Sequence, residues 1–204
     1  MEDNYLTITD ISEGQFKDRG SRFIGFLYPI SSEAEVKERL AVLKKQYHDA
    51  THYCYAYTIG HTGPAKTRLN DDGEPSGSAA RPIFGQLQSA GLSDVLAVVV
   101  RFFGGVKLGV PGLINAYKTT TKLAIENANV VERHVLECAE ARLPYERMSA
   151  LLNLLKKENA AIRDIGYAGS DALVRFEIRR LQYEGVKEKI SLLPFVSLQH
   201  TGTK

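Results

Sequence analysis

The sequence has 204 residues, which is enough for one large domain or two small ones. Its hydrophobic fraction of 44% and charged fraction of 25% are ordinary for a globular protein, and they exclude a wholly disordered chain. The net charge is only +2, and the parts before and after residue 131 are each close to neutral. Neither part therefore has the basic excess of a protein that holds nucleic acid mainly by charge.

The chain carries no signal for membrane insertion or secretion. Its first residues, Met-Glu-Asp-Asn, are acidic where a secretory signal would be basic. The longest apolar run, residues 95–100, is far shorter than the roughly 20 residues that cross a bilayer. The cysteines are Cys54 and Cys138, and without a CxxC pair or a Cys/His cluster they support neither a disulfide framework nor a structural zinc site. We expect a cytosolic protein that does not bind a membrane.

The first part of the chain predicts strands and helices in an α+β arrangement. Strands are expected at residues 5–9 and 23–28, joined by a polar connection that contains glycine. A helix should follow to about residue 47, because Ser32 and Glu35 have capping-box spacing at its start. The further expected elements are a strand at 53–59, a polar loop at 60–77, a helix at 79–90, a buried strand at 94–103, a glycine-rich loop at 104–112 and a helix at 113–127.

A second pattern begins near residue 132. Strands are expected at 134–141, 161–167, 173–179 and 195–200, and helices at 144–158 and 181–192. The order β-α-β-β-α-β is that of a ferredoxin-like unit. We therefore predict two domains, residues 1–131 with a mixed sheet and residues 132–204 with the ferredoxin-like fold.

One strand of the second domain alternates cleanly between apolar and charged residues. Val174, Phe176 and Ile178 are expected to face inward. The alternating residues Arg175, Glu177 and Arg179 are expected to form a solvated face, because they carry no aromatic partner for stacking on RNA bases.

Several motifs in the first domain stand in the order and spacing of a known family. They are DATHYCYA at residues 49–56, DDGEPSG at 71–77 and VVVRFFGGVKLG at 98–109, with SRF at 21–23 and LINAY at 113–117. By these motifs the chain resembles the IMPACT/YigZ family over most of residues 17–129. The second domain looks like the domain that bacterial YigZ-type members carry after it.

The resemblance implies a fold and a functional class. It implies that the first domain is like the second domain of ribosomal protein S-five, and that the pair is like domains four and five of elongation factor G. It also implies a regulatory or binding protein linked to translation, without an established catalytic activity, whose partner is RNA, the ribosome or a translation-linked protein.

The glycine-rich loop is the first candidate site. Gly104 and Gly105 lie between a buried strand and a helix, where backbone N–H groups can bind an anion such as phosphate, with Arg101 and Lys107 adding charge. The alternative is that the glycines only allow positive φ angles and close packing. The spacing matches neither phosphate-binding fingerprint, so both interpretations stay open.

An acidic loop is the second candidate. Asp71, Asp72 and Glu74 could hold Mg²⁺, which prefers oxygen ligands. The favoured interpretation is a turn, because Asp-Gly is turn chemistry, followed by a serine of residues 76–78 as the cap of the next helix.

His52 and Arg81 complete the expected cleft, and Cys54 lies beside His52 in the sequence. His52 and Cys54 should face the same side of a strand, which makes a Cys/His nucleophile conceivable, although a core cysteine and a polar pocket histidine are favoured. Arg81, in the first turn of a helix, should pair with the acidic loop or bind an anion.

Three functions remain open for this cleft. The preferred one is the translation-linked binder, with His52, Arg81, Arg101 and the glycine-rich loop holding phosphate or RNA. The second is a Mg²⁺-assisted enzyme acting on a small phosphorylated or nucleotide substrate at the glycine-rich loop. The third is a plain protein-interaction module.

Overall fold

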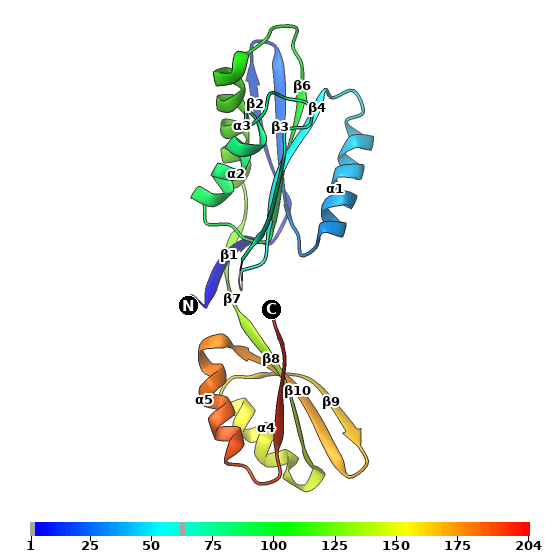
Figure 1. The fold of residues 1–204 in the computed structure, drawn as a ribbon, viewed down its shortest axis with the longest axis vertical. Helices are drawn as coiled ribbons and strands as arrows, with labels where there is room; N and C mark the ends of the chain where they lie inside the picture. Colours follow the sequence, from blue (N-terminus) through cyan, green and yellow to red (C-terminus); the bar gives the residue numbers. More distant parts are fainter. Residues whose placement is uncertain (1–2, 62–63) are drawn as a thin grey trace. The chain divides into compact units, whose positions relative to one another are not determined.

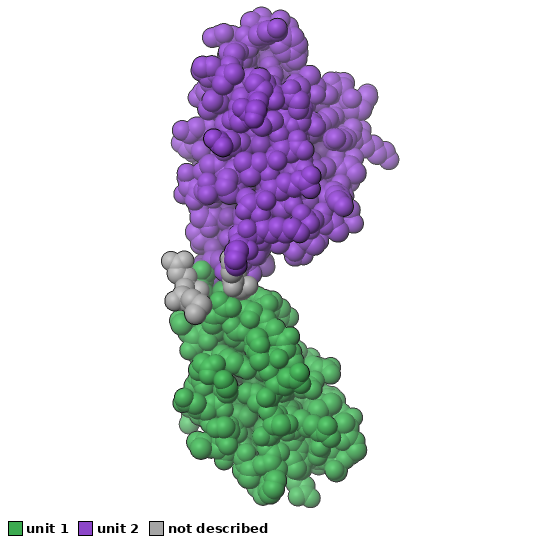
Figure 2. All heavy atoms as spheres, viewed as in Figure 1, with its two compact units in different colours: residues 1–4, 134–204 green, residues 5–133 purple. Residues whose placement is uncertain are grey.

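The structure, a computed structural model, describes residues 3–61 and 64–204. Within them the chain forms two compact units (Figure 2). The larger unit comprises Tyr5–Arg133, and the smaller comprises residues 134–204 together with residues 3–4. Within the described residues there are several sheets and five α-helices, which confirms the α+β class. No helix of the described residues is long and apolar enough to cross a membrane.

A five-stranded sheet forms the middle layer of the larger unit. Its strands, in spatial order, are β2 (Ser12–Asp18), β3 (Ser21–Pro29), β6 (Val95–Phe102), β4 (His52–Ile59) and β5 (Lys66–Asn70). All four pairings are antiparallel, so the expectation of a mixed sheet is wrong. β3 and β4 run parallel to each other, but β6 lies between them and pairs antiparallel with both.

Helices cover both faces of this sheet (Figure 1). Helix α1 (Glu33–Gln46) lies on one face, and α2 (Ala80–Ser89) and α3 (Gly109–Glu126) lie on the other. Alternate residues of β3 feed the two cores, because Phe23 and Leu27 pack on the α2 and α3 side while Ile24, Phe26 and Tyr28 pack on the α1 side. The core strands are therefore apolar on both faces, as the unbroken run in β6 predicts.

Helix α1 begins where the spacing of Ser32 and Glu35 predicts. The Ser32 hydroxyl accepts a hydrogen bond from the Glu35 N–H at 3.4 Å, and the Glu35 carboxylate accepts one from the Ser31 N–H at 3.2 Å. The Glu35 side chain reaches back one residue further than in the standard capping box, and its role is the same.

Three strands were not predicted: the edge strands β2 and β5 and the short strand β7 (Val130–His134). β2 falls in the stretch that was expected to be a polar connection, and β5 falls in the expected loop at 60–77, of which residues 62–63 lie outside the described part. Both are edge strands of the sheet, and β5 is exposed over almost its whole length, so neither has the apolar pattern that marks a core strand. A short pair of strands, β1 (Asn4–Ile8) and β7 (Val130–His134), forms a separate sheet.

The smaller unit has a four-stranded antiparallel sheet with two helices. The strands in spatial order are β11 (Ser197–Thr203), β8 (Leu136–Pro144), β10 (Asp171–Arg179) and β9 (Ala161–Ala168). Helices α4 (Met148–Lys157), preceded by a 3-10 turn at Tyr145–Arg147, and α5 (Arg180–Ser191) pack on one face (Figure 1).

The face opposite those helices differs from the prediction at one residue. Val174, Phe176 and Ile178 are buried as predicted, and Arg175 is exposed. Glu177, which was expected to be solvated, is only 4% exposed, because it forms ion pairs with Arg163 and Lys204 that cover it. The expectation of a wholly solvated face is therefore wrong at Glu177.

Candidate functional site

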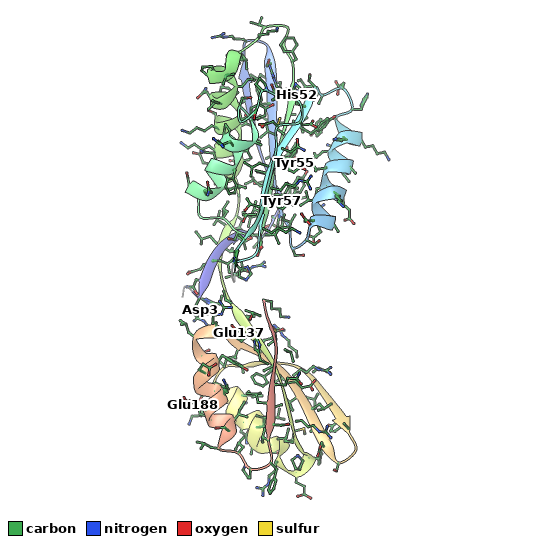
Figure 3. The ribbon with its side chains drawn as sticks, viewed as in Figure 1. Asp3, His52, Tyr55, Tyr57, Glu137 and Glu188 are labelled. Atoms are coloured by element: carbon green, nitrogen blue, oxygen red, sulfur yellow. The ribbon has the colours of Figure 1, made fainter. Side chains whose placement is uncertain are left out.

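The strand register brings His52 and Arg101 together. They are direct partners in the antiparallel pairing of β4 and β6, and Phe23 of β3 is the partner of Arg101 on its other side. Cys54 lies two residues further along β4, so its side chain points to the same face of the sheet as that of His52. Both belong to the face that α2 and α3 cover, and Figure 3 labels His52 near the end of the strand.

Arg101 forms a buried ion pair rather than an open anion site. Its Nη1 donates to Glu74 Oε1 at 2.5 Å, and the side chains of Arg101 and Glu74 are only 7% and 4% exposed. The Tyr117 hydroxyl of α3 donates to the same oxygen at 2.7 Å. The guanidinium also lies near the rings of Phe23 and Phe103, at 5.5 and 5.6 Å from their centroids. Arg101 is therefore already paired with a buried carboxylate, so a phosphate would have to compete with Glu74 for the guanidinium, and phosphate binding at Arg101 stays a prediction.

One nitrogen of the Arg101 guanidinium lacks a hydrogen-bond partner among the described residues. Arg101 Nε is buried and has no hydrogen-bond partner within residues 3–61 and 64–204. A buried unpaired donor is costly, so the ion pair with Glu74 alone does not satisfy the guanidinium.

The acidic loop is a turn whose carboxylates are used inside the protein. Asp71 accepts hydrogen bonds from the N–H groups of Gly77, Ala79 and Ala80, at 2.9, 3.1 and 2.8 Å, and so caps the start of α2. Asp72 accepts from the Tyr53 N–H at 2.7 Å. The favoured turn is thus present, but the cap of α2 is Asp71 and not the serine that was expected.

The hydrogen bonds of the acidic loop also speak against the hypothesis that it holds Mg²⁺. Among the described residues no group of three or more His, Cys, Asp and Glu side chains is placed to hold a metal ion. Asp71 and Glu74 direct their oxygens at protein donors, so the loop is not preorganised for Mg²⁺.

His52 and Cys54 are both held by this loop. His52 Nδ1 is 2.8 Å from the Asp72 carbonyl oxygen, and its Nε2 is 3.9 Å from Glu74 Oε1. The Cys54 thiol donates to the Asp71 carbonyl at 3.0 Å and lies 3.2 Å from the Tyr117 hydroxyl oxygen. Burial raises the pKa of the Cys54 thiol well above its ordinary value, and burial likewise raises the pKa of Tyr117. Cys54 is therefore a core thiol and not an activated nucleophile.

The glycines of the glycine-rich loop have packing roles. A Cβ added to Gly104 would lie 1.9 Å from the carbonyl carbon of Gly20, so the loop and the β2–β3 turn approach each other at a distance that only glycine allows. Gly105 has φ +86°, which also favours glycine. The alternative interpretation of close packing and positive φ thus accounts for both residues.

The remaining predicted residues lie outside the buried network. Lys107 is exposed on the loop, and Leu108, the residue at the N-terminal cap position of α3, provides no side-chain hydrogen bond to the helix. Arg81 is also exposed, and no ion pair with the acidic loop is present among the described residues. Some residues of the expected cleft contact one another in the interior: His52, Asp72, Glu74 and Arg101. The others lie at the surface: Arg81, Gly104, Gly105 and Lys107.

The expectation of a buried strand at 94–103 is wrong at its end, because β6 ends at Phe102 and the next residue, Phe103, is exposed. Phe103 is 48% exposed, and Val106 of the same loop is 52% exposed. The Arg22 guanidinium lies 4.2 Å from the centroid of the Phe102 ring. We call Arg22, Phe102 and residues 103–107 the loop end. The signal for it was the Phe-Phe pair that ends an apolar strand and enters a polar, glycine-rich loop.

The loop end is therefore the most exposed part of the candidate site. It combines an aromatic ring, apolar side chains and the cations Arg22 and Lys107, and it borders the buried network at Arg101. Such a surface can stack on planar groups and attract negative charge.

Comparisons with known proteins agree with the motifs. Residues 19–125 match the family model of the Impact N-terminal domain. The IMPACT family member YvyE of Bacillus subtilis is 36% identical over 168 residues, which cover 82% of this chain and 77% of that protein. The IMPACT family member YigZ of Escherichia coli is 29% identical over 148 residues, 72% of each chain.

A solved structure has the same fold over the full length. A crystal structure described as that of a hypothetical protein covers 99% of this chain and 99% of its own, with a TM-score of 0.75 and 23% sequence identity. The family-model match spans more than half of the chain, and the relatives match it across both units. The chain belongs to the IMPACT family.

Proposed function

We propose that this chain is a non-catalytic binding protein of the translation apparatus, and that its loop end binds single-stranded RNA. The observation that carries the proposal is the exposed Phe103 ring in the same loop as the exposed Lys107, next in sequence to Phe102, whose ring contacts the Arg22 guanidinium. Bases of single-stranded RNA stack on such rings, and the neighbouring cations are suited to its phosphates.

The charge balance of the chain fits a limited contact of this kind. A net charge of +2 does not provide a broad basic surface, so binding would depend on stacking and on a few cations. Exposed Arg19, in the turn that packs on Gly104, is a further cation at the same end of the sheet.

The fold supports the link to translation by analogy. We propose that the larger unit is like the second domain of ribosomal protein S-five. For the smaller unit we propose a ferredoxin-like domain, for which the strand order β11-β8-β10-β9 and the element order β-α-β-β-α-β provide support. The pair would then be like domains four and five of elongation factor G. Fold analogy alone does not establish function, so the loop end is what must be tested.

A Mg²⁺-assisted enzyme is less well supported. The carboxylates that would bind the metal cap α2 or neutralise Arg101, and the thiol of Cys54 is buried with a raised pKa. These groups stabilise the fold around the loop end and leave the loop end itself as the accessible surface.

The test is fluorescence anisotropy of a short labelled single-stranded RNA with the full chain. Phe103→Ala should weaken binding by roughly 5- to 150-fold, the equivalent of about 1–3 kcal/mol for one stacked base. Lys107→Ala should lower the slope of log affinity against log salt by about 1, because one phosphate contact is lost.

Lys122→Ala is the matched control. Lys122 is an exposed lysine of α3 that pairs with Glu126, and it is not part of the loop end. RNA binding that is equally reduced in Lys122→Ala, or that is unchanged in Phe103→Ala, would contradict the proposal. If RNA does not bind but a protein partner does, without strong salt dependence, the plain interaction module becomes the better account.

A further inference from the structure

The outer strand β9 of the smaller unit has a free edge. Among the described residues β9 pairs with β10 on one side and has no neighbouring strand on the other (Figure 1). The backbone N–H and C=O groups of alternate residues in a strand point to opposite sides, so an outer strand presents a row of these groups without a partner in its own sheet. Such a row can pair with a strand of another chain.

Apolar side chains lie along this edge. Ile162, Ile165 and Tyr167 are 40%, 37% and 63% exposed, although their register partners on β10 all belong to the buried core. Register partners share a face, so these side chains lie on the face that carries the helices, and the helices leave them uncovered. The ring of Tyr145, which is 58% exposed, lies 6.0 Å from that of Tyr167. A free backbone edge and an apolar stripe therefore run side by side.

The other outer strands of the two larger sheets carry features that discourage pairing with a further strand. β5 carries Lys66 and Arg68, and β2 carries Glu13 and Lys17, all of them exposed charges. The register of β11 shifts beyond His200. Exposed charges and irregular register are the devices by which proteins keep sheet edges apart.

The regular part of β9 is residues 164–168. A bulge at Arg163 shifts the register with β10 and would end the pairing with a further strand at this point. The charges beside the bulge are paired within the unit, Arg163 with Glu177 and Asp164 with Arg175. The residues after the bulge include neither proline nor lysine, so this part of the edge is unguarded.

This regular segment is complementary to itself. When two copies pair antiparallel about a twofold axis at Gly166, Ile165 of each chain lies opposite Tyr167 of the other. The axis thus creates two pairs of a β-branched and an aromatic side chain, which is a favourable cross-strand combination. Asp164 lies opposite Ala168 in this register, so no like charges meet. A register centred on Asp164 would oppose two carboxylates and is disfavoured.

We propose that β9 is a homodimer interface, at which two copies of this chain join their four-stranded sheets edge to edge through residues 164–168 with Gly166 at the twofold axis. The contact is isologous, the commonest arrangement in homodimers. A contact of this length is small for a protein interface, so the dimer forms at high protein concentration. The interface is independent of the function proposed for the loop end.

Sedimentation velocity of the full chain, over a concentration series up to the millimolar level, measures the mass in solution. We expect the mass to rise with concentration from 22.6 kDa towards twice that value. Ile165→Glu and Tyr167→Lys, each made alone, should weaken dimerisation by roughly 2- to 30-fold, because the symmetry removes two cross-strand pairs at once.

The double variant Ile165→Glu/Tyr167→Lys tests the register. It should restore the dimer, because opposite charges then face each other on both sides of the axis. If the axis lay at Ile165 instead, the double variant would oppose two carboxylates and would dissociate at least as readily as Ile165→Glu alone. That result would overturn the register centred on Gly166.

Leu192→Lys is the matched control. Leu192 follows α5 in the same unit, is 82% exposed and is not part of β9. Equal weakening of the dimer in Leu192→Lys and Ile165→Glu would overturn the proposal. So would the mass of a single chain at every concentration, which would leave the edge to a strand of a different protein. The substituted side chains are exposed, so the variants are compatible with folding, which the amide spectrum verifies.

Discussion

Glu74 is the residue on which the interior of the candidate site depends. It receives Arg101 and Tyr117 on one oxygen, and both of these partners are buried. A buried cation whose partner is removed is strongly destabilising, whereas an exposed ion pair contributes little.

Glu74→Gln should therefore reduce the free energy of unfolding by about 3–5 kcal/mol, because it leaves the Arg101 charge buried and uncompensated. Chemical denaturation measures the change. Glu126→Gln, which breaks the exposed pair with Lys122, serves as the reference and should cost less than about 1 kcal/mol. Equal losses in the two variants would show that the Arg101–Glu74 pair is not a buried charge pair.

Cysteine reactivity tests the assignment of Cys54 to the core. Its thiol is buried and its pKa is raised by burial, so it should resist alkylation by iodoacetamide at neutral pH in the native protein. Cys138 is partly exposed and should be modified first, although burial raises its pKa as well. Peptide mass spectrometry gives the extent at each site, and rapid labelling of native Cys54 would mean that the thiol is accessible and activated.

At the scale of elements, short-range signals were enough for the helices and the apolar strands. The Ser32–Glu35 spacing marks the start of α1, and the apolar run marks β6, and both are present. β2 and β5 escaped prediction because edge strands bury little, and their residues carry no continuous apolar pattern. The sequence did not predict Asp71 as the cap of α2, because Asp71 is nine residues from Ala80 and reaches it only through the turn of the acidic loop.

Removing that cap should destabilise α2. Asp71→Ala leaves the N–H groups of Gly77, Ala79 and Ala80 without their acceptor and should cost about 1–2 kcal/mol in thermal or chemical unfolding. Ser76→Ala, at an exposed serine that the sequence suggested as a cap, should leave stability unchanged within about 0.5 kcal/mol. A larger effect at Ser76 than at Asp71 would reverse the assignment of the cap.

The contact between the glycine-rich loop and the β2–β3 turn gives a steric prediction. Gly104→Ala forces a Cβ against the Gly20 backbone and should destabilise the protein by about 1–3 kcal/mol. Gly85→Ala, in the interior of α2 with no heavy atom within 4 Å of the added Cβ, should instead stabilise it by about 0.4–1 kcal/mol. If Gly104→Ala proves neutral in the same denaturation assay, the two loops do not approach as described.

At the scale of the whole molecule, the sequence could predict the class of the fold but not the contacts of the site. The α+β class and the alternation of β10 follow from periodicity. The ion pair of Arg101 with Glu74 does not follow from periodicity. Glu74 lies 27 residues earlier in the chain and contacts Arg101 only once β4 and β6 have paired. For the same reason Glu177 was expected in solvent, since Arg163 and Lys204 come to it from β9 and from the residue after β11.

Two carboxylates of the smaller unit predict its response to acid. Burial alone would raise the pKa values of Glu137 and Glu177. Bonds from Thr203, Arg180 and His200 to Glu137, and from Lys204 and Arg163 to Glu177, hold these pKa values below the ordinary 4.5. A depressed folded-state pKa adds stability that is present above the unfolded-state pKa and is lost as the pH falls through the folded-state value.

The free energy of unfolding of the smaller unit should therefore fall as the pH drops below 4.5. Amide exchange of β8 and β10 followed by NMR across this range measures it. Glu137→Gln should lower stability at neutral pH and flatten the acid dependence, because one of the two titrating carboxylates is gone. An unchanged acid profile in this variant would exclude Glu137 as a source of the effect.

The central claim is that the loop end binds single-stranded RNA, and mapping the contact tests it most directly. Amide and aromatic resonances of the full chain are followed by NMR during titration with a short single-stranded RNA. The account predicts that the largest shifts fall on Arg22, Phe102 and residues 103–107 and that they fade as salt is raised. Shifts that are absent, or that centre on the smaller unit while the loop end stays unchanged, would contradict it.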